Sequence, residues 1–365
     1  IKLNKNLKNL KVIIDFKNKR NFYKINNLSN LRYDFIIIGS GPAAVTLYKK
    51  IISIKKKTKL LMIERGDFIN NSYKKVYTNK FPIKLESRVF GVGGTSNAWS
   101  NISSYFEKFE MISRWSHNRY LWPLNYKDLI KNYKELQKIL GFDFQKIKQL
   151  NLNIPFTVRK FIGAVNPTNF KNLINSDEID LLYNCEVDTI DENNKCAFIN
   201  ILNNKISFKA KKLIICCGGI ETVKLIKHSI KKKKLSLIKN KHMIGKCFMD
   251  HPKISLGYLL YPKLSILSKI EFKKENKHFH YAGISLKQNE QIKKKLLNSY
   301  IRFEKSNGNQ NDIINILSNK LINKIFNYKR KIIYKLRLFC EMSPSENNRI
   351  IFKNNKTYIQ YKFNK

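Results

Sequence analysis

The 365-residue sequence lacks several features that would each mark a class of protein. It has no run of roughly 20 apolar residues, the length that a helix needs to cross a bilayer, so no membrane span is expected. Its six cysteines include no CxxC pair, and no metal site is predicted. A disulfide between the adjacent Cys216 and Cys217 would be strained, which favours reduced thiols and a cytoplasmic location. Because the chain begins with Ile1 rather than Met, a preceding targeting segment stays open.

Acidic residues are scarce: 26 stand against 71 lysines and arginines, giving a net charge of +45. Such an excess is typical of proteins that bind nucleic acid or anionic membranes. Only 11 of the 71 are arginine, however, and Lys, Asn and Ile, which have A/T-rich codons, dominate the whole chain. The lysine runs at 55–57, 231–234 and 293–295 are scattered. We therefore interpret the charge as solvated surface and expect no nucleic-acid partner, with a polyanion-binding protein as the alternative.

The length and the 43% apolar content predict one large or two interleaved folded domains. Short apolar runs indicate buried parallel strands, and apolar residues at helical spacing indicate amphipathic helices. The predicted strands are 33–38, 59–63, 181–190, 197–202, 206–211 and 213–217, and the predicted helices begin near Ala44, Asn125 and Gly218, the last running through Leu225.

The first strand leads directly into the sequence Gly39-Ser-Gly41-Pro42-Ala43-Ala44. In a dinucleotide-binding turn, the first glycine makes the turn and the second lets a pyrophosphate approach the backbone. A small third residue, here Ala44, allows the strand and helix to pack closely. The N–H groups at the start of the helix then attract the phosphates.

Two further segments fit the same site. Glu64 ends the next strand, 25 residues after Gly39, where a carboxylate binds ribose hydroxyls and repels the 2′-phosphate of NADP. Arg65 follows it. A second glycine-rich loop supplies additional backbone donors; its residues are Gly91, Gly93, Gly94, Thr95, Ser96 and Asn97.

These three segments and three others occur in an order that resembles the glucose–methanol–choline (GMC) oxidoreductase family. The resemblance runs from about residue 31 to 260 and returns at Glu341–Pro344 and Asn348–Arg349. The blocks that carry it are the Gly39 turn, Glu64-Arg65-Gly66, Gly93–Trp99, Trp122–Tyr126, Cys217–Thr222 and Gly245–Pro252.

The resemblance implies an α/β fold in which a doubly wound FAD/NAD(P)-binding domain is interleaved with an antiparallel-sheet substrate domain. It implies FAD as cofactor and hydride transfer to the flavin from alcohols, most often sugars or polyols, with the electron acceptor unknown. Val187 would meet the adenine, Gly218 would lie beside the dinucleotide, and Asn97 and Trp99 would line the flavin edge. Relatives that tether the flavin covalently have a His where this chain has Ala98, so FAD is expected to be noncovalent.

The expected domain boundaries follow from the same comparison. Residues 1–30 are interpreted as an N-terminal extension. The FAD-binding domain is expected at 31–105 and 180–260, and the substrate domain at 106–179 and 261–365, incomplete at its C-terminal end.

No catalytic residue is assigned. The family's catalytic His and its partner lie beyond the proline motif, and this chain ends at Lys365 soon after that motif, so a catalytically incomplete fragment or remnant is the alternative reading. His278 and His280 share a strand face and are a second possibility for the base. His251 is interpreted as part of a buried turn, whereas His117, His228 and His242 have no acid nearby in the sequence. A disulfide reductase is excluded because no Cys precedes Cys185.

Overall fold

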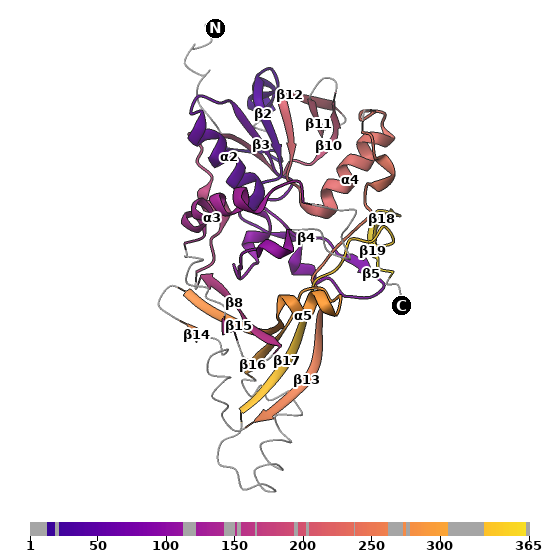
Figure 1. Cartoon of the computed structure of the whole chain (residues 1–365). Coiled ribbons are helices and arrows are strands. Elements are labelled where there is room, and N and C mark those ends of the chain that lie inside the picture. The colour runs from indigo at the N-terminus through magenta and orange to yellow at the C-terminus, as the bar shows by residue number, and fades with distance from the viewer. Residues whose placement is uncertain are drawn as a thin grey trace, which may run out of the picture. The chain divides into compact units, whose positions relative to one another are not determined.

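The computed structural model describes most of the chain. The described residues are 13–18, 22–111, 122–141, 150–151, 155–164, 166–192, 196–201, 204–236, 238–261, 273–274, 278–305 and 332–362. The chain folds into two compact units, each assembled from separate stretches of sequence (Figure 1). The first unit comprises residues 1–99, 169–248 and 345–365, and the second comprises 100–168 and 249–344.

The first unit is built around a seven-stranded sheet. Its strands are β1 (Ile13–Asp15), β2 (Arg32–Ile38), β3 (Leu60–Ile63), β9 (Asp180–Tyr183), β10 (Val187–Asp191), β11 (Cys196–Ile201) and β12 (Asn204–Ile215). The order is β1-β9-β3-β2-β12-β11-β10, in which the first five strands are parallel and the last two pair antiparallel. All four residues of β3 are buried, as expected for a parallel strand covered on both faces.

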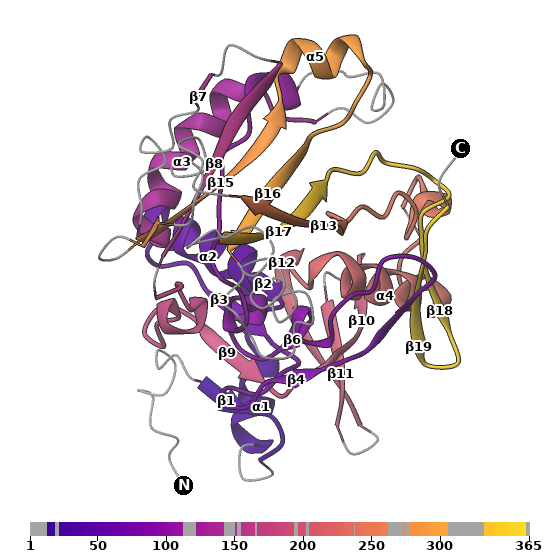
Figure 2. The ribbon, with the colours of Figure 1, turned by 90° about the horizontal axis from the view of Figure 1, so that it is seen from below.

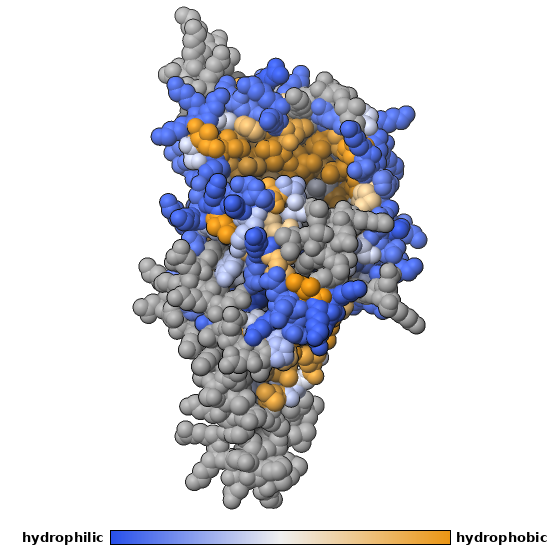
Figure 3. Space-filling model, in the orientation of Figure 1, coloured by the Kyte–Doolittle hydropathy of each residue, from blue (hydrophilic) through white to orange (hydrophobic). Residues whose placement is uncertain are grey.

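Helices and two small sheets complete the first unit. The helices are α1 (Phe22–Ser29), α2 (Pro42–Ile54) and α4 (Gly218–Lys231); the remaining strands are β4 (Ser72–Tyr73), β5 (Val76–Thr78), β6 (Val89–Phe90), β18 (Arg349–Lys353) and β19 (Lys356–Gln360). β18 and β19 form an antiparallel hairpin, and β19 pairs in parallel with β5. α4 lies beside this hairpin (Figures 1 and 2). Apolar side chains form a band in the region of β2, β3 and β12, bordered by hydrophilic residues (Figure 3).

The second unit is an antiparallel sheet with two helices among its described residues. The strands are β7 (Leu150–Asn151), β8 (Phe156–Ala164), β13 (Lys253–Tyr261), β14 (Lys273–Lys274), β15 (His278–Leu286), β16 (Ser299–Lys305) and β17 (Ile332–Cys340), and the helices are α3 (Tyr126–Leu140) and α5 (Gln288–Lys293). The path is β13-β17-β16-β15-β8-β7, with β14 paired to β15. α3 begins where the Asn125 side chain accepts a hydrogen bond from the Asp128 N–H, and it ends at Gly141 with φ 76°.

Short 3₁₀ turns connect several of these elements. They span Leu85–Ser87, Gly94–Asn97, Lys108–Glu110, Phe170–Leu173 and Lys241–Met243.

The expected fold class is confirmed: a parallel α/β unit is interleaved with an antiparallel-sheet unit. Two strand predictions are wrong. The single strand expected at 181–190 is broken into β9 and β10, because Asn184 between them has φ 57°, a left-handed conformation that ends a strand. The two strands expected at 206–211 and 213–217 form a single strand, β12. The strand continues through Lys211, whose side chain forms an ion pair with Asp34.

The two units also divide the sequence differently from the expected domains. The expected N-terminal extension contains β1, which pairs with β9, and its residues Ile14, Ile25 and Leu28 belong to the core of the first unit. Residues 345–365 belong to the first unit rather than to the substrate domain, because β19 pairs with β5.

Candidate functional site

The carboxyl ends of three neighbouring parallel strands meet at one edge of the first unit's main sheet. Ile38 at the end of β2 pairs with Ile63 of β3 on one side and with Ile215 of β12 on the other. The Gly39 N–H donates to the Ile63 carbonyl over 2.8 Å, and the Cys216 N–H donates to the Ile38 carbonyl over 2.7 Å. Because β3 and β12 lie on opposite sides of β2, this edge is a switch point, where open α/β sheets bind ligands.

The turn that follows β2 requires glycine. Gly39 has φ 98°, and a Cβ atom there would lie 2.5 Å from the carbonyl oxygen of Cys216. Gly41 is the N-cap of α2, and Pro42 occupies the first helical position, where the missing N–H costs nothing. The backbone N–H groups of the first turn therefore point along the helix axis, in the arrangement that attracts anions.

The second glycine-rich loop touches this turn. Gly93 and Gly94 have φ 94° and 56°, and a Cβ atom on Gly94 would lie 2.9 Å from the Cα atom of Gly41. A side chain on Gly94 would therefore have no room between the two backbone segments. We call residues 39–43 together with 93–97 the dinucleotide cradle, since its bare backbone can admit a pyrophosphate.

Glu64 is buried beside the cradle, with 6% of its surface exposed. Its Oε2 accepts hydrogen bonds from the Ser40 N–H at 3.0 Å and the Ser40 hydroxyl at 2.7 Å. Its Oε1 accepts one from the Gly66 N–H at 2.7 Å. Burial raises the pKa of Glu64, although the hydrogen bonds from Gly66 and Ser40 act in the opposite direction.

Ser40 joins three parts of the site, and the sequence analysis missed it. Its hydroxyl donates to Glu64 and accepts a hydrogen bond from the Gly93 N–H at 3.1 Å, so it links the first turn, the end of β3 and the second loop. The signal in the sequence was the position of Ser40 between the two glycines of the turn. There its side chain can point away from the backbone face that is expected to meet the phosphates.

The architecture around this edge can be compared with known proteins. No family model and no curated protein matches the sequence. The fold resembles that of an oxidase. The crystal structure of pyridoxine 4-oxidase from Mesorbium loti superposes with a TM-score of 0.50, covering 90% of this chain and 75% of that chain. At 12% sequence identity, this likeness concerns the fold alone.

The remaining residues of the second loop fix its shape. The Ser96 hydroxyl donates to the Gly93 carbonyl at 2.7 Å and accepts from the Phe170 N–H at 3.0 Å. The Asn97 amide donates to the Val92 carbonyl at 3.0 Å. Thr95 is exposed, and the Trp99 ring packs edge-on against Phe170. The places predicted for Asn97 and Trp99 at a flavin edge stay predictions.

Arg65 lies in a charged cluster on the other side of Glu64. It forms ion pairs with Glu186 at 3.2 Å and Glu221 at 3.3 Å, and Arg88 also pairs with Glu221. These partners, more than 100 residues away in the chain, were not predicted from the sequence.

The two remaining predicted cofactor contacts lie at strand and helix starts. Val187 begins β10 and is 9% exposed. Gly218 begins α4 with φ 70° and has open space where a Cβ would stand. Their expected contacts with the cofactor remain predictions.

The structure describes five of the six histidines, and none of these five is assigned as a base. In the second unit, the His278 ring contacts the Gly141 carbonyl at 2.7 Å and so ties β15 to the end of α3. His280 is half-buried on the same strand. The expectation that His251 lies in a buried turn is wrong, since its side chain is 75% exposed and contacts the adjacent Asp250 at 3.1 Å. The His228 ring lies 3.2 Å from Asp188, an acid that is distant in the sequence, whereas His117 lies outside the described residues.

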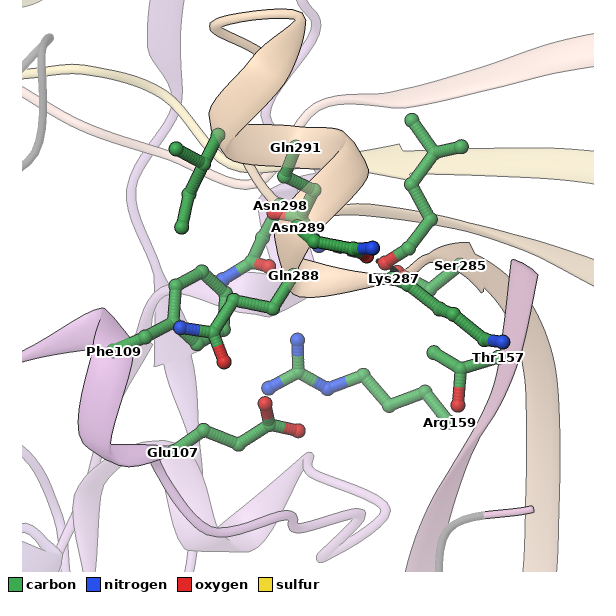
Figure 4. A pocket seen from close by; sticks show the side chains of 12 residues that line it. Glu107, Phe109, Thr157, Arg159, Ser285, Lys287, Gln288, Asn289, Gln291 and Asn298 are labelled. Atoms are coloured by element: carbon green, nitrogen blue, oxygen red, sulfur yellow. Dashed lines mark hydrogen bonds between the residues drawn. The ribbon is translucent and has the colours of Figure 1, made fainter. Parts of the chain in front are cut away.

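The second unit contains a cavity of about 420 Å³ (Figure 4). Arg159 reaches into it from β8 with the Glu107 carboxylate facing it, and its guanidinium pairs with Glu110 at 2.8 Å. Burial alone would lower the pKa of Arg159, but the charge of Glu110 and its hydrogen bond raise the pKa overall. The cavity suits a small polar molecule.

Two features of the described part of the chain bear on other kinds of site. There, no three His, Cys, Asp or Glu side chains gather as a metal site would require. No described helix is long and apolar enough to cross a membrane. The Cys217 thiol donates to the Ile38 carbonyl, and burial raises its pKa to about 12, so this thiol stays protonated and unreactive at neutral pH.

Proposed function

We propose that this chain is an FAD-dependent oxidoreductase of the GMC type that oxidises CH–OH groups of alcohols, with sugars or polyols as the expected substrates. The observation that carries the proposal is the contact between the two glycine-rich segments of the dinucleotide cradle. A Cβ on Gly94 would meet the Cα of Gly41 at 2.9 Å, so position 94 does not tolerate a side chain where the two segments approach each other.

The residues present fit FAD in charge and in hydrogen bonding. The start of α2 offers N–H groups and a partial positive charge to the two phosphates. Glu64 Oε1 accepts a hydrogen bond from the Gly66 N–H, and a carboxylate oxygen can accept a second one from a ribose hydroxyl. A carboxylate at this position would repel the 2′-phosphate of NADP.

The chemistry expected of bound FAD is acceptance of a hydride from the alcohol carbon. The described residues bind and orient: the cradle admits the pyrophosphate, and Ser40 holds the second loop against the first turn. Ala98 has no nucleophilic side chain, which supports a noncovalent cofactor. The neighbour of similar fold is, by its name, an oxidase, which agrees with redox chemistry on this fold.

Gly94→Ala tests the proposal, with Gly141→Ala as the matched control. Both glycines have left-handed φ values, 56° and 76°, but a Cβ on Gly141 would meet nothing within 4 Å. Each change should cost about 1–2 kcal/mol of stability through backbone strain. Only Gly94→Ala should also weaken FAD, by roughly tenfold or more, because it pushes the two cradle segments apart.

The measurement is a titration of the apoprotein with FAD, followed by flavin fluorescence. Equal FAD affinities for Gly94→Ala and Gly141→Ala would show that the cradle does not hold the cofactor.

A further inference from the structure

A second concave site in the first unit has an unusual charge. It is a groove of about 780 Å³ between α4, the turn Lys241–Lys246 and the β18–β19 hairpin, and we call it the basic groove. Seven lysines and one arginine are among its 18 lining residues, and no acidic residue is. Lysine makes up 60 of the 365 residues of the chain, so its share of the lining is more than twice the average. The general richness of the chain in lysine therefore does not account for the lysine content of the groove lining.

One wall of the basic groove is a row of lysines on α4. Lys224, Lys227 and Lys231 are spaced three and four residues apart, so they lie on one face of the helix. At a rise of about 1.5 Å per residue, the row is roughly 10 Å long. Lys224 pairs with Glu186 at 3.1 Å, an acid outside the lining. Lys227 and Lys231 form no ion pair with any acid in the described ranges.

Another part of the groove lining comes from the end of the β18–β19 hairpin. Asn354 and Asn355 make its two-residue turn with φ 48° and 56°. The turn places Lys353 directly opposite Lys356. Two like charges across a strand pair destabilise a hairpin, so this arrangement is unfavourable unless an anion lies between or beside them.

The positive charge of the basic groove is partly compensated by acids outside its lining. Lys246 pairs with Glu346 at 3.0 Å, and the His228 ring lies 3.2 Å from Asp188. Burial lowers the pKa of Lys227. Burial, followed by the charges of Lys224 and Arg65, lowers the pKa of Lys74 at the rim. Burial is the first cause for both lysines, and for Lys74 the charges of Glu221 and Glu186 act in the opposite direction.

We propose that the basic groove binds a small ligand that carries several linked phosphate groups, such as a polyphosphate chain or a nucleoside triphosphate, separately from the dinucleotide cradle. A phosphate group carries a charge of about −1.5 to −2 at neutral pH, so linked phosphates place far more negative charge in a given volume than carboxylates do. The volume lies within the usual range of about 300–1,000 Å³ for small-ligand sites. Phe352 is the one Phe, Tyr or Trp in the described lining, which is little stacking surface for single-stranded nucleic acid.

The test is calorimetric titration of the full chain, saturated with FAD, with inorganic tripolyphosphate. The groove variant carries Lys227→Gln, Lys231→Gln and Lys353→Gln. The matched control carries Lys55→Gln, Lys56→Gln and Lys57→Gln, three exposed lysines of the same unit, so both variants lose the same charge. All six side chains are exposed, so both variants should keep the circular dichroism spectrum of the parent.

The groove variant should bind tripolyphosphate roughly tenfold more weakly or worse, because the losses of three charged contacts multiply. The control should change by about twofold at most, since its charges are distant and screened. Lys353→Gln alone should give an intermediate loss. Absence of binding by the parent, or equal losses in the two triple variants, would overturn the proposal.

Three further arms identify the ligand. An oligoglutamate peptide that binds as tightly as tripolyphosphate would overturn the assignment to phosphate. A short single-stranded oligonucleotide that binds more tightly, and is lost in the groove variant, would make the groove a nucleic-acid surface instead. Displacement of tripolyphosphate by excess FAD would show that the two ligands share one site, which also contradicts the proposal.

Discussion

Replacing Ser40 by alanine should loosen the cradle, and the structure sets the size of the effect. Ser40 is 0% exposed, and its hydroxyl makes two hydrogen bonds, one to the Glu64 carboxylate at 2.7 Å and one from the Gly93 N–H at 3.1 Å. A hydrogen bond to a charged group contributes about 1.5–3 kcal/mol, and a buried N–H left without an acceptor costs about 1–3 kcal/mol. Because water has no access to Ser40, we expect Ser40→Ala to lower the free energy of unfolding by roughly 3–4 kcal/mol.

Ser53→Ala is the control for this change. Ser53 lies in α2 of the same unit, is exposed, and donates one hydrogen bond to the Lys50 carbonyl at 2.8 Å. Its replacement should stay within about 0.5 kcal/mol of the parent. In urea denaturation, where stability falls by about 1–3 kcal/mol per molar urea, Ser40→Ala should lower the midpoint by roughly 1 M or more. Equal midpoints for the two variants would refute the role given to Ser40.

Two other predictions concern carboxylates of the first unit. Glu64→Gln should weaken FAD binding by roughly 1–3 kcal/mol, because a charged acceptor is lost. The control is Glu178→Gln, which removes a surface ion pair with Lys49 and should leave the FAD affinity unchanged in the same fluorescence titration. Hydrogen bonds from Asn70, Asn184 and Ile69 lower the pKa of Asp67 from 3.8 to about 2, so its stabilising contribution is present above pH 3.8 and is lost as the pH falls towards 2. Asp67→Asn should therefore be less stable than the parent at neutral pH and equal to it near pH 2; a constant difference across that range would contradict this.

The local part of the site could be predicted from the sequence. Gly39 and Gly41 follow an apolar strand and precede a helix, and Glu64 ends the next strand, so short-range spacing was enough to bring them to one edge of the sheet. The helix at 126–140 was equally predictable, because its N-cap Asn125 and its apolar spacing are both local signals.

The parts that the sequence did not predict depend on distant partners. Arg88 and Glu221 are 133 residues apart, and no local pattern joins them. The β18–β19 hairpin pairs with β5, which lies more than 270 residues earlier in the chain. For the same reason, lysines that look scattered along the sequence gather in one groove only after α4 and the hairpin are brought together.

The central claim is that the chain holds FAD without a covalent bond. The most direct measurement is to saturate the purified protein with FAD, remove the excess by gel filtration, and precipitate the protein with acid. The account predicts a yellow protein whose chromophore appears in the supernatant and is identical to free FAD by chromatography. A protein that retains no flavin after gel filtration, or a pellet that keeps the colour, would contradict it.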